Sequence, residues 1–195
     1  GMLGADVIGF HTQQHCNNFL ETVSKELESL VDLEKFTITH KGHITQIRPF
    51  PISVAFAENV KSGESKSPLL EKLGLKTKYL GLGVDRLDYT KGILEKLRGV
   101  EFFFDMYPDY QEQFTLLQIA SPTREGVVKY RQFNEDVTVE TERINKKFAR
   151  NDWQPIVLLK KHYSHEEIYQ LYRASDFCLV ASLSDVMNLV AKECV

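Results

Sequence analysis

Over the second half of the chain, hydrophobic and polar positions alternate regularly between a pattern typical of strands and a pattern typical of helices. Short apolar runs typical of buried strands occur at residues 78–84, 114–120, 156–160 and 177–181. Helical periods separate them at residues 93–106, around 125–150 and at 165–174, and a fourth helix begins near Asn188. Because the strands are apolar on both faces and alternate with helices, the pattern predicts an α/β fold: a parallel sheet with helices on both faces.

The first fifty residues show a shorter pattern of strands and one helix. Residues 5–10 predict a buried strand. Thr12 is placed to cap a following helix, whose apolar stripe would be Phe19, Val23, Leu27 and Leu30. Residues 36–40 and 44–47 predict two paired strands joined at Lys41-Gly42.

A polar stretch without apolar periodicity, residues 57–67, separates the two patterns. We therefore predict a first unit over residues 1–60, a linker with one short helix over 61–77, and a second unit over 78–195. The short helix is expected to run from Ser67-Pro68 to Gly74, since Ser favours the N-cap, Pro the first turn and Gly the end.

Three cationic side chains follow the first two strands of the predicted parallel sheet. Arg86 and Lys91 come after the first strand, and Arg124 comes after the second. Loops at the carboxyl ends of parallel strands share one edge, so these cations should meet beside helix N-termini. That setting favours a phosphate or diphosphate. The chain has no GxxxxGKS or GxxxxGKT loop and no GxGxxG after a strand, and Gly81 with Gly83 alone is weak evidence.

Composition narrows the class of protein. The 195 residues carry a net charge of −3, which disfavours nucleic-acid binding, and no apolar run reaches the ~20 residues of a membrane span. The first residues lack the basic and apolar segments of a signal peptide. Cys16, Cys178 and Cys194 are interpreted as buried free thiols in a reducing cytosol, so a cytoplasmic protein is expected. Without adjacent carboxylates or a His/Cys cluster, we expect no metal site.

Other conspicuous residues have structural interpretations. His11 and His15 stand four residues apart, but without a third ligand they are expected on a helix surface rather than at zinc. Trp153 is expected to cover the core after a helix end. The charged stretch 140–150 is expected to form an exposed helix face with pairs such as Glu142–Lys146.

The second unit also carries an ordered set of longer motifs. They are GVDRLDYTKG at residues 83–92, QIASPTR at 118–124, RIN at 143–145 and DVMNLVAKE at 185–193. Together they resemble the trehalose-6-phosphate synthase family, far more specifically than any one of them would. ADVIGFHT at 5–12 and RPFPISV at 48–54 resemble the end of that family's first domain. The resemblance thus covers nearly the whole chain.

The resemblance implies a GT-B fold, in which two Rossmann-like domains face each other across a cleft. This chain would supply the donor-binding domain, incomplete at its C-terminus, and a remnant of the acceptor-side domain. The implied reaction transfers glucose from UDP-glucose to glucose 6-phosphate with retention at the anomeric carbon. The resemblance implies no cofactor and no required metal.

The same resemblance implies roles for individual residues. Arg86 and Lys91 would be the catalytic pair, holding the donor diphosphate and stabilising charge on the leaving UDP. Arg124 would lie at the acceptor phosphate. The remaining donor-binding residues would be Glu193 at the ribose hydroxyls, Asp185, Met187, Asn188 and Leu189 at the sugar and phosphates, and His162 and Tyr163 beside the uracil.

Two departures from the family pattern limit these expectations. Val186 stands where the family has glycine, and a β-branched residue adds bulk and disfavours a positive φ. Most of the family's first domain has no counterpart here, and residue 195 falls inside the last helix that the pattern predicts. The chain is therefore expected to be a fragment that does not turn over alone.

Alternatives remain open at this stage. The chain could be a non-catalytic nucleotide-sugar-binding or regulatory module, whereas a phosphatase is disfavoured because no strand ends in DxDxT. The nucleotide base and the acceptor are not fixed by the residues themselves. Expected partners are a nucleotide sugar and a sugar phosphate, without nucleic acid or membrane. Apolar surface on an incomplete first domain would favour self-association into a homo-oligomer.

Overall fold

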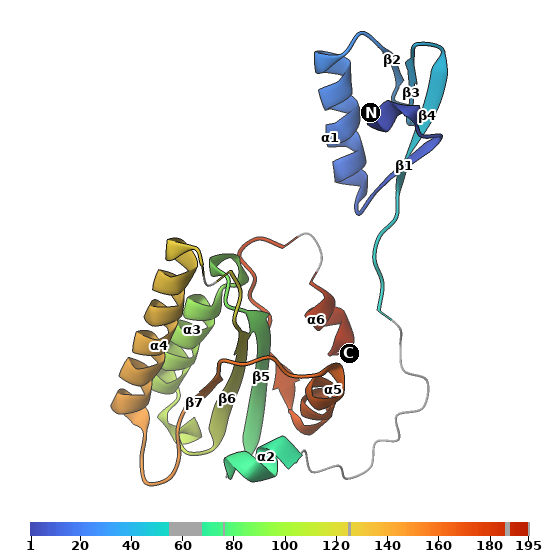
Figure 1. Cartoon of the computed structure of the whole chain (residues 1–195). Coiled ribbons are helices and arrows are strands. Elements are labelled where there is room, and N and C mark those ends of the chain that lie inside the picture. The colour runs from blue at the N-terminus through green and yellow to red at the C-terminus, as the bar shows by residue number, and fades with distance from the viewer. Residues whose placement is uncertain (55–67, 76, 125, 186–187, 195) are drawn as a thin grey trace. The chain divides into compact units, whose positions relative to one another are not determined.

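The structure, a computed structural model, describes residues 1–54, 68–75, 77–124, 126–185 and 188–194 (Figure 1). The chain divides into two compact units, residues 1–55 and 56–195. Residues 61–67 and 76 of the sequence-predicted linker, residues 61–77, lie outside the described residues, but its short helix is present as α2 (Pro68–Leu73), followed by Gly74 at a φ of 61°.

The first unit is a four-stranded sheet with one helix packed on it (Figure 1). Its elements are η1 (Met2–Gly4), β1 (Val7–Phe10), α1 (Gln13–Glu26), β2 (Leu30–Asp32), β3 (Thr37–His40) and β4 (His43–Pro49). The strand order is β1-β4-β3-β2, with β1 parallel to β4 and the other pairs antiparallel. The Thr12 side chain accepts a hydrogen bond from the His15 amide, which confirms the predicted cap.

Helix α1 is shorter than its apolar stripe predicted. It ends at Glu26, and Leu27 already has an extended backbone. Leu30 begins strand β2 and pairs with Thr39, so hydrogen bonding to β3 prevails over the helical spacing at this position. The prediction that Leu27 and Leu30 continue the helix was therefore wrong, and strand β2 was missed.

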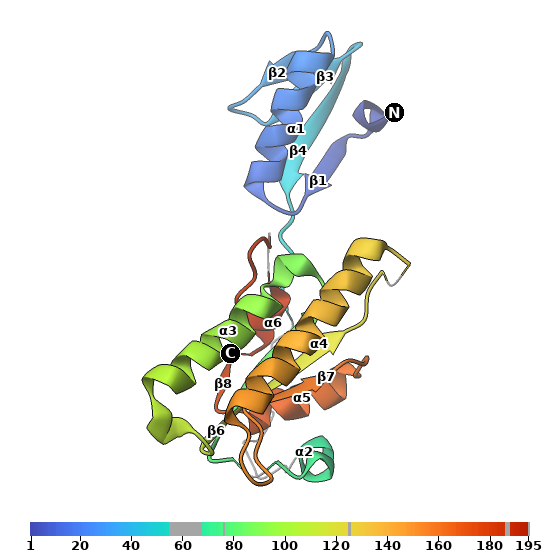
Figure 2. The ribbon, with the colours of Figure 1, turned by 90° about the vertical axis from the view of Figure 1, so that its left-hand side faces the viewer.

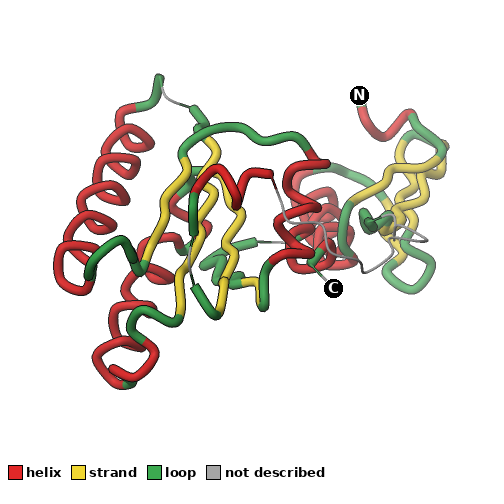
Figure 3. The backbone as a smooth tube through the Cα atoms, turned by 90° about the horizontal axis from the view of Figure 1, so that it is seen from below, coloured by secondary structure: helices red, strands yellow, loops and turns green. Residues whose placement is uncertain are grey.

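The second unit is a parallel sheet between helices, as predicted. Its further elements are β5 (Tyr79–Arg86), η2 (Tyr89–Lys91), α3 (Ile93–Met106), η3 (Pro108–Tyr110), β6 (Phe114–Ser121), α4 (Val128–Phe148), β7 (Ile156–Leu159), α5 (His165–Ala174), β8 (Phe177–Cys178) and α6 (Leu189–Glu193). The order β7-β6-β5-β8 is parallel throughout. Helices α3 and α4 cover one face of the sheet and α5 covers the other, an arrangement visible from two further directions (Figures 2 and 3).

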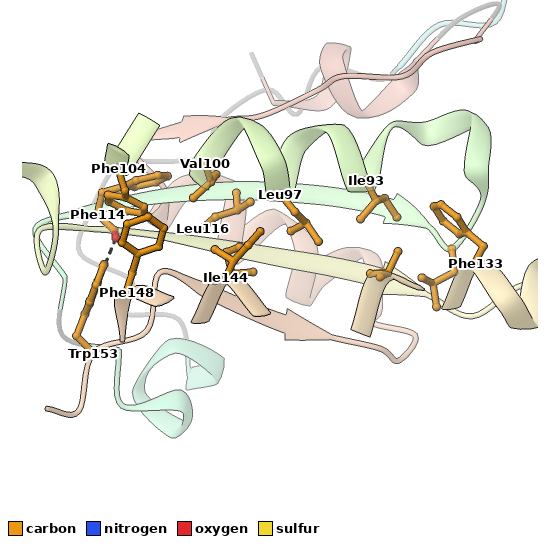
Figure 4. Packing of buried hydrophobic residues seen from close by; sticks show 14 residues of the cluster. Ile93, Leu97, Val100, Phe104, Phe114, Leu116, Phe133, Ile144, Phe148 and Trp153 are labelled. Atoms are coloured by element: carbon orange, nitrogen blue, oxygen red, sulfur yellow. Dashed lines mark hydrogen bonds between the residues drawn. The ribbon is translucent and has the colours of Figure 1, made fainter. Parts of the chain in front are cut away.

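An aromatic cluster closes the core between the sheet and helices α3 and α4 (Figure 4). Phe104 packs against both Phe148 and Trp153, and Trp153 is buried after the end of α4. The Trp153 indole donates to Phe114 O at 3.2 Å and to Thr115 Oγ1 at 3.0 Å. This confirms that Trp153 covers the core, because a buried indole N–H is stable there only with an acceptor.

Charged side chains link the outer surfaces of α3 and α4. Arg143 and Lys147 both bond to Glu101, with Arg143 Nη1 to Glu101 Oε1 at 2.9 Å and Lys147 Nζ to Glu101 Oε1 at 3.0 Å. The predicted pair Glu142–Lys146 is not among the ion pairs of the described residues. The spacing in the sequence indicated ion pairs within α4. Most of the ion-pair partners of α4 instead lie on α3, and only the packing of the two helices brings these side chains together.

The cysteine prediction held only in part. Cys16 is a buried free thiol, but Cys178 of β8 and Cys194 at the end of α6 form a disulfide, with their Cα atoms 6.6 Å apart. The fold brings together two residues that are 16 positions apart in sequence, at a Cα separation that a disulfide can bridge. The expectation of free thiols at Cys178 and Cys194 was therefore wrong.

Candidate functional site

The order of the parallel strands marks one place for a ligand. The chain passes from β5 outward to β6 and β7, and then returns to place β8 on the other side of β5. The loops that follow β5 and β8 therefore leave the sheet in opposite directions. In open α/β sheets such a switch point, at the carboxyl ends of the strands, is where ligands bind.

The loops after β5 and β8 contact each other at this switch point. The Leu183 amide donates to Thr90 O at 2.8 Å, and the Ser184 amide donates to the same oxygen at 3.3 Å. Gly92, in the loop after β5, has a φ of 64°, and a Cβ at this position would lie 1.9 Å from Ala181 O in the segment after β8. Glycine is thus required at position 92 both by the backbone conformation and by the close approach of the second loop.

A buried carboxylate, Asp88, organises the loop after β5. Its Oδ1 accepts from the amide and the hydroxyl of Thr90, at 3.0 and 2.9 Å, and so caps the turn that ends at Lys91. Burial acts to raise the pKa of Asp88, but the Thr90 hydrogen bonds and the charges of Arg86 and Lys91 outweigh it and hold the pKa below its usual value. Both predicted cations therefore act on the same carboxylate.

The two cations differ in their present contacts. Arg86, the last residue of β5, is exposed, and its guanidinium has no hydrogen bond or ion pair with any residue that the structure describes. Lys91 is largely buried, with 15% of its side chain exposed, and its Nζ lies 2.5 Å from Asp185 Oδ2. A ligand phosphate at this edge would meet Arg86 directly and would compete with Asp185 for Lys91.

The third predicted cation, Arg124, reaches the same cluster through Tyr130. Arg124 Nη1 donates to the Tyr130 hydroxyl at 3.1 Å, and that hydroxyl lies 3.5 Å from Asp88 Oδ2. Arg124 also has a positive φ of 48°, which an arginine adopts only where its surroundings hold it there. The structure thus links the loop after β6 to the loop after β5.

The segment between β8 and α6 contains part of the predicted donor-binding set. Asn188 caps α6, because its Oδ1 accepts from the Ala191 amide at 3.3 Å, while its Nδ2 donates to Ser182 Oγ at 3.0 Å. Leu189 is the first residue of α6. Met187 and the departure at Val186 lie outside the described residues.

Glu193, predicted at a ribose, lies at the end of α6 and is tied to α5. The Tyr172 hydroxyl donates to Glu193 Oε2 at 3.4 Å. Burial, reinforced by the charge of Glu193, raises the pKa of Tyr172, so the phenol stays protonated and remains a donor. This contact holds the Glu193 carboxylate in place from one side.

His162 and Tyr163 lie in the loop after β7, at the opposite edge of the sheet order from β8. His162 is exposed, whereas Tyr163 packs on the hydrophobic cluster that also contains Tyr172. The Tyr163 hydroxyl is buried and has no hydrogen-bond partner among the described residues. The structure therefore brings Tyr163 near α5 through that shared cluster, and among the described residues it gives His162 no comparable link.

A large hollow in this unit is lined by none of the three predicted cations. A groove of about 800 Å³ runs between α3 and β8, lined mainly by apolar and aromatic side chains: Tyr79, Val100, Phe103, Tyr110, Phe114 and Phe177. Such a lining does not suit a diphosphate. Among the described residues no group of three or more His, Cys, Asp or Glu side chains is arranged to hold a metal, and no helix is long and apolar enough to cross a membrane.

Comparison with known proteins decides the family. The model of glycosyltransferase family 20 matches residues 1–195. The chain belongs to glycosyltransferase family 20. It is 35% identical to the alpha,alpha-trehalose-phosphate synthase (UDP-forming) of Candida albicans, over 99% of this chain and 41% of that protein. The family assigned from the motifs is thereby confirmed.

Solved structures agree with the family 20 assignment. An alpha,alpha-trehalose-phosphate synthase from Burkholderia xenovorans, in complex with glucose-6-phosphate, matches with a TM-score of 0.85 and 32% identity, over 99% of this chain and 43% of that one. An E. coli structure bound with UDP-2-fluoro glucose matches with a TM-score of 0.83 and 29% identity, again over 99% and 43%. These similarities confirm the predicted α/β class and the GT-B relationship. The chain spans about 41% of its curated relative.

Two features of this family 20 chain were not foreseen from its sequence. His11 precedes α1 instead of lying on it, and its Nε2 is buried without a partner among the described residues, so the helix-surface interpretation of His11 was wrong. The buried pair Lys96–Asp85 was not recognised either. A lysine three residues after Ile93, on the buried stripe of α3, is the signal that could have shown it.

Proposed function

We propose that this chain forms the nucleotide-sugar-binding part of a retaining glucosyltransferase. The reaction would move glucose from UDP-glucose to glucose 6-phosphate and give α,α-trehalose 6-phosphate and UDP. The observation that carries the proposal is the position of Arg86 and Lys91, which flank Asp88 at the switch point between β5 and β8. The named activities of the family 20 relatives support the choice of donor and acceptor.

The chemistry follows from where negative charge develops. As the bond between the anomeric carbon and the β-phosphate oxygen breaks, that oxygen gains charge, and two fixed cations stabilise it more than they stabilise the ground state. The acceptor's anomeric hydroxyl would form the new bond on the same face, and its proton would pass to the departing phosphate. No enzymic carboxylate pair of the hydrolase kind is needed for such a step.

The ion pair between Lys91 and Asp185 would have to rearrange when the donor binds. A diphosphate must draw the Lys91 ammonium at least partly from Asp185, since the two now lie 2.5 Å apart. The released carboxylate would then accept hydrogen bonds from hydroxyls of the donor sugar. Asn188 and Leu189 at the start of α6, together with Met187, and Glu193 at its end would complete the donor side, with His162 and Tyr163 near the base.

The acceptor phosphate is assigned to Arg124, which already lies beside the Asp88 cluster through Tyr130. The proposal includes no metal and no other cofactor, because Arg86 and Lys91 supply the positive charge. It also places the protein in the cytoplasm, with small-molecule partners only. Whether copies of the chain associate is left to measurement of its mass in solution.

Titration calorimetry of donor binding tests the proposed site. UDP-glucose, GDP-glucose and ADP-glucose are titrated into the 195-residue chain as matched donors, and a separate incubation with UDP-glucose and glucose 6-phosphate quantifies released UDP and the disaccharide phosphate. The proposal expects UDP-glucose to bind more tightly than the other two donors. Equal binding of all three, or binding of none, would contradict the assignment of the donor site.

A non-catalytic binding module is the second candidate, and the motif containing Val186 favours it. Where the family has glycine this chain has a β-branched residue beside the sugar-binding Asp185. Binding of UDP-glucose without product would support this candidate, and product formation would exclude it. If Val186→Gly leaves donor affinity unchanged, the steric argument behind this second candidate fails.

A further inference from the structure

An ion pair lies buried beneath the switch point, where the proposed donor site does not use it. Lys96 of α3 and Asp85 of β5 have only 1% and 4% of their side chains exposed, and Lys96 Nζ contacts Asp85 Oδ2. Both side chains are therefore almost fully buried. A buried ion pair contributes little net stability compared with apolar residues of the same size, so stability alone gives a weak reason for it.

The contacts of the pair join the parts that carry the site. Lys96 Nζ also donates to Leu179 O, at 3.5 Å, in the segment that leaves β8. Gln118 of β6 donates from Nε2 to Asp85 Oδ2 at 3.0 Å. One ammonium group therefore connects α3, the end of β5 and the segment after β8, and a buried amide adds β6.

The neighbouring glycine fits this arrangement. A Cβ at Gly83 would lie 2.2 Å from Gln118 Oε1, so the bare backbone of β5 leaves room for the Gln118 side chain to reach Asp85. Asp85 directly precedes Arg86 in the chain. Leu179 is the first residue of the segment between β8 and α6, which contains Asp185 and Asn188. The buried pair therefore lies where both loops begin.

We propose that Lys96 and Asp85 are positioning residues, which set the spacing of the two loops across the β5–β8 switch point. They act through Arg86 and Lys91 on one side and Asp185 on the other, and they touch no substrate. The expected effect on ligand affinity rests on the proposed function, whereas the effect on the loops does not.

The test compares loop order with overall stability. Lys96→Met removes the charge but keeps the length of the side chain, and Val137→Ala, a buried position of α4 in the same core, is the control for a general loss of stability. Hydrogen exchange is measured well below the unfolding midpoint at residues 87–92 and 179–185, with β6 as internal reference. We expect exchange about 10-fold faster in both loops of Lys96→Met, and unchanged loops in Val137→Ala.

The double variant Lys96→Met with Asp85→Asn keeps the test decisive if the single variant does not fold. It leaves no unpaired buried charge, so folding should be recovered. Positioning predicts that the loops of this variant still exchange faster than those of the wild type. A purely structural pair predicts that loops and stability are restored together, and that result would overturn the proposal.

Calorimetry with UDP separates this proposal from the proposed function. We expect Lys96→Met to weaken UDP binding about 10-fold, because the groups that contact the ligand are displaced. If no variant binds UDP, wild type included, but the loops respond as described, the donor site is wrong and the positioning role stands. If the wild type binds UDP and Lys96→Met matches it in both affinity and exchange, the positioning role is wrong.

Discussion

Single residues at the switch point have distinguishable tasks. Arg86 forms no hydrogen bond or ion pair with the described residues, while Lys91 is held by Asp185. Asp88 lies between them and fixes the turn through Thr90. A ligand anion would therefore meet one prepared cation and one that must exchange its partner, and substitutions at Arg86, Lys91 and Asp185 should give different results.

Asp185→Asn should change the preference between UDP and UDP-glucose. Removing the charge frees Lys91 for the phosphates, so UDP should bind as tightly as to the wild type or more tightly. UDP-glucose should lose about 1 kcal/mol of relative affinity, the value of one hydrogen bond to the sugar. Titration calorimetry with both ligands measures this ratio, and an unchanged ratio would show that Asp185 does not contact the sugar.

Gly92 and Gly99 are a matched pair of sites for substitution, because an added methyl group meets a close neighbour at the first and open space at the second. Gly92→Ala should destabilise the protein by about 1–3 kcal/mol, because the backbone has a positive φ and Ala181 O occupies the space of a Cβ. Gly99→Ala, in α3 with no atom within 4 Å of the added methyl group, should stabilise it by about 0.5–1 kcal/mol. Urea unfolding measures both, and effects of the same sign would refute the close approach at Gly92.

Among the secondary-structure elements, the regular helices and strands of the second unit were the most predictable. Residues 93–106 and 165–174 match α3 and α5 because both helices have an apolar stripe and clear ends. Strand β8 was predicted over 177–181 but covers Phe177–Cys178, since β5 is its one paired neighbour among the described residues. The prediction for helix α1 was too long because Leu30 pairs with strand β3 instead, and strand pairing depends on partners that are distant in sequence.

The contact between α3 and α4 predicts a pH dependence of stability. Hydrogen bonds from Arg143 lower the pKa of Glu101 to about 2, against 4.5 ordinarily. A lowered carboxyl pKa stabilises the fold above the unfolded-state value, and this contribution is lost as the pH falls from about 4.5 to about 2. Glu101→Gln should therefore lower the thermal midpoint at neutral pH and differ less from the wild type in acid.

Glu142→Gln is the control for that measurement. Glu142 lies on the exposed side of α4 and takes no part in the ion pairs of the described residues. Its replacement should leave the thermal midpoint unchanged at both pH values. Equal loss of stability in the two variants, or a constant difference between Glu101→Gln and wild type across this pH range, would show that the ion pairs do not contribute as described.

At the scale of the whole molecule, the site was predictable as an edge of the sheet but not as a set of contacts. The positions of Arg86, Lys91 and Arg124 after consecutive strands indicated a shared edge, and all three connect to Asp88. The Lys91–Asp185 pair and the buried Lys96–Asp85 pair depend on β8 returning beside β5. Nothing in the local sequence specifies that return, since it is a matter of strand order.

The roles given to Asp185, Met187, Asn188, Leu189, Glu193, His162 and Tyr163 rest on the family 20 resemblance and remain predictions. The structure ties Glu193 to Tyr172 and gives Tyr163 a place in the adjacent cluster. His162 gained no contact that supports its role. The part of the site that physical argument carries furthest is the pair of cations at residues 86 and 91.

Calorimetric titration of UDP into four forms of the chain tests that pair most directly. The forms are the wild type, Arg86→Ala, Lys91→Ala and Arg98→Ala, where Arg98 is a matched cation on the outer side of α3, paired with Glu140. Loss of one charged hydrogen bond should weaken UDP binding by about 1.5–3 kcal/mol in the first two variants and leave Arg98→Ala at the wild-type affinity. Unchanged UDP binding in both Arg86→Ala and Lys91→Ala would contradict the account.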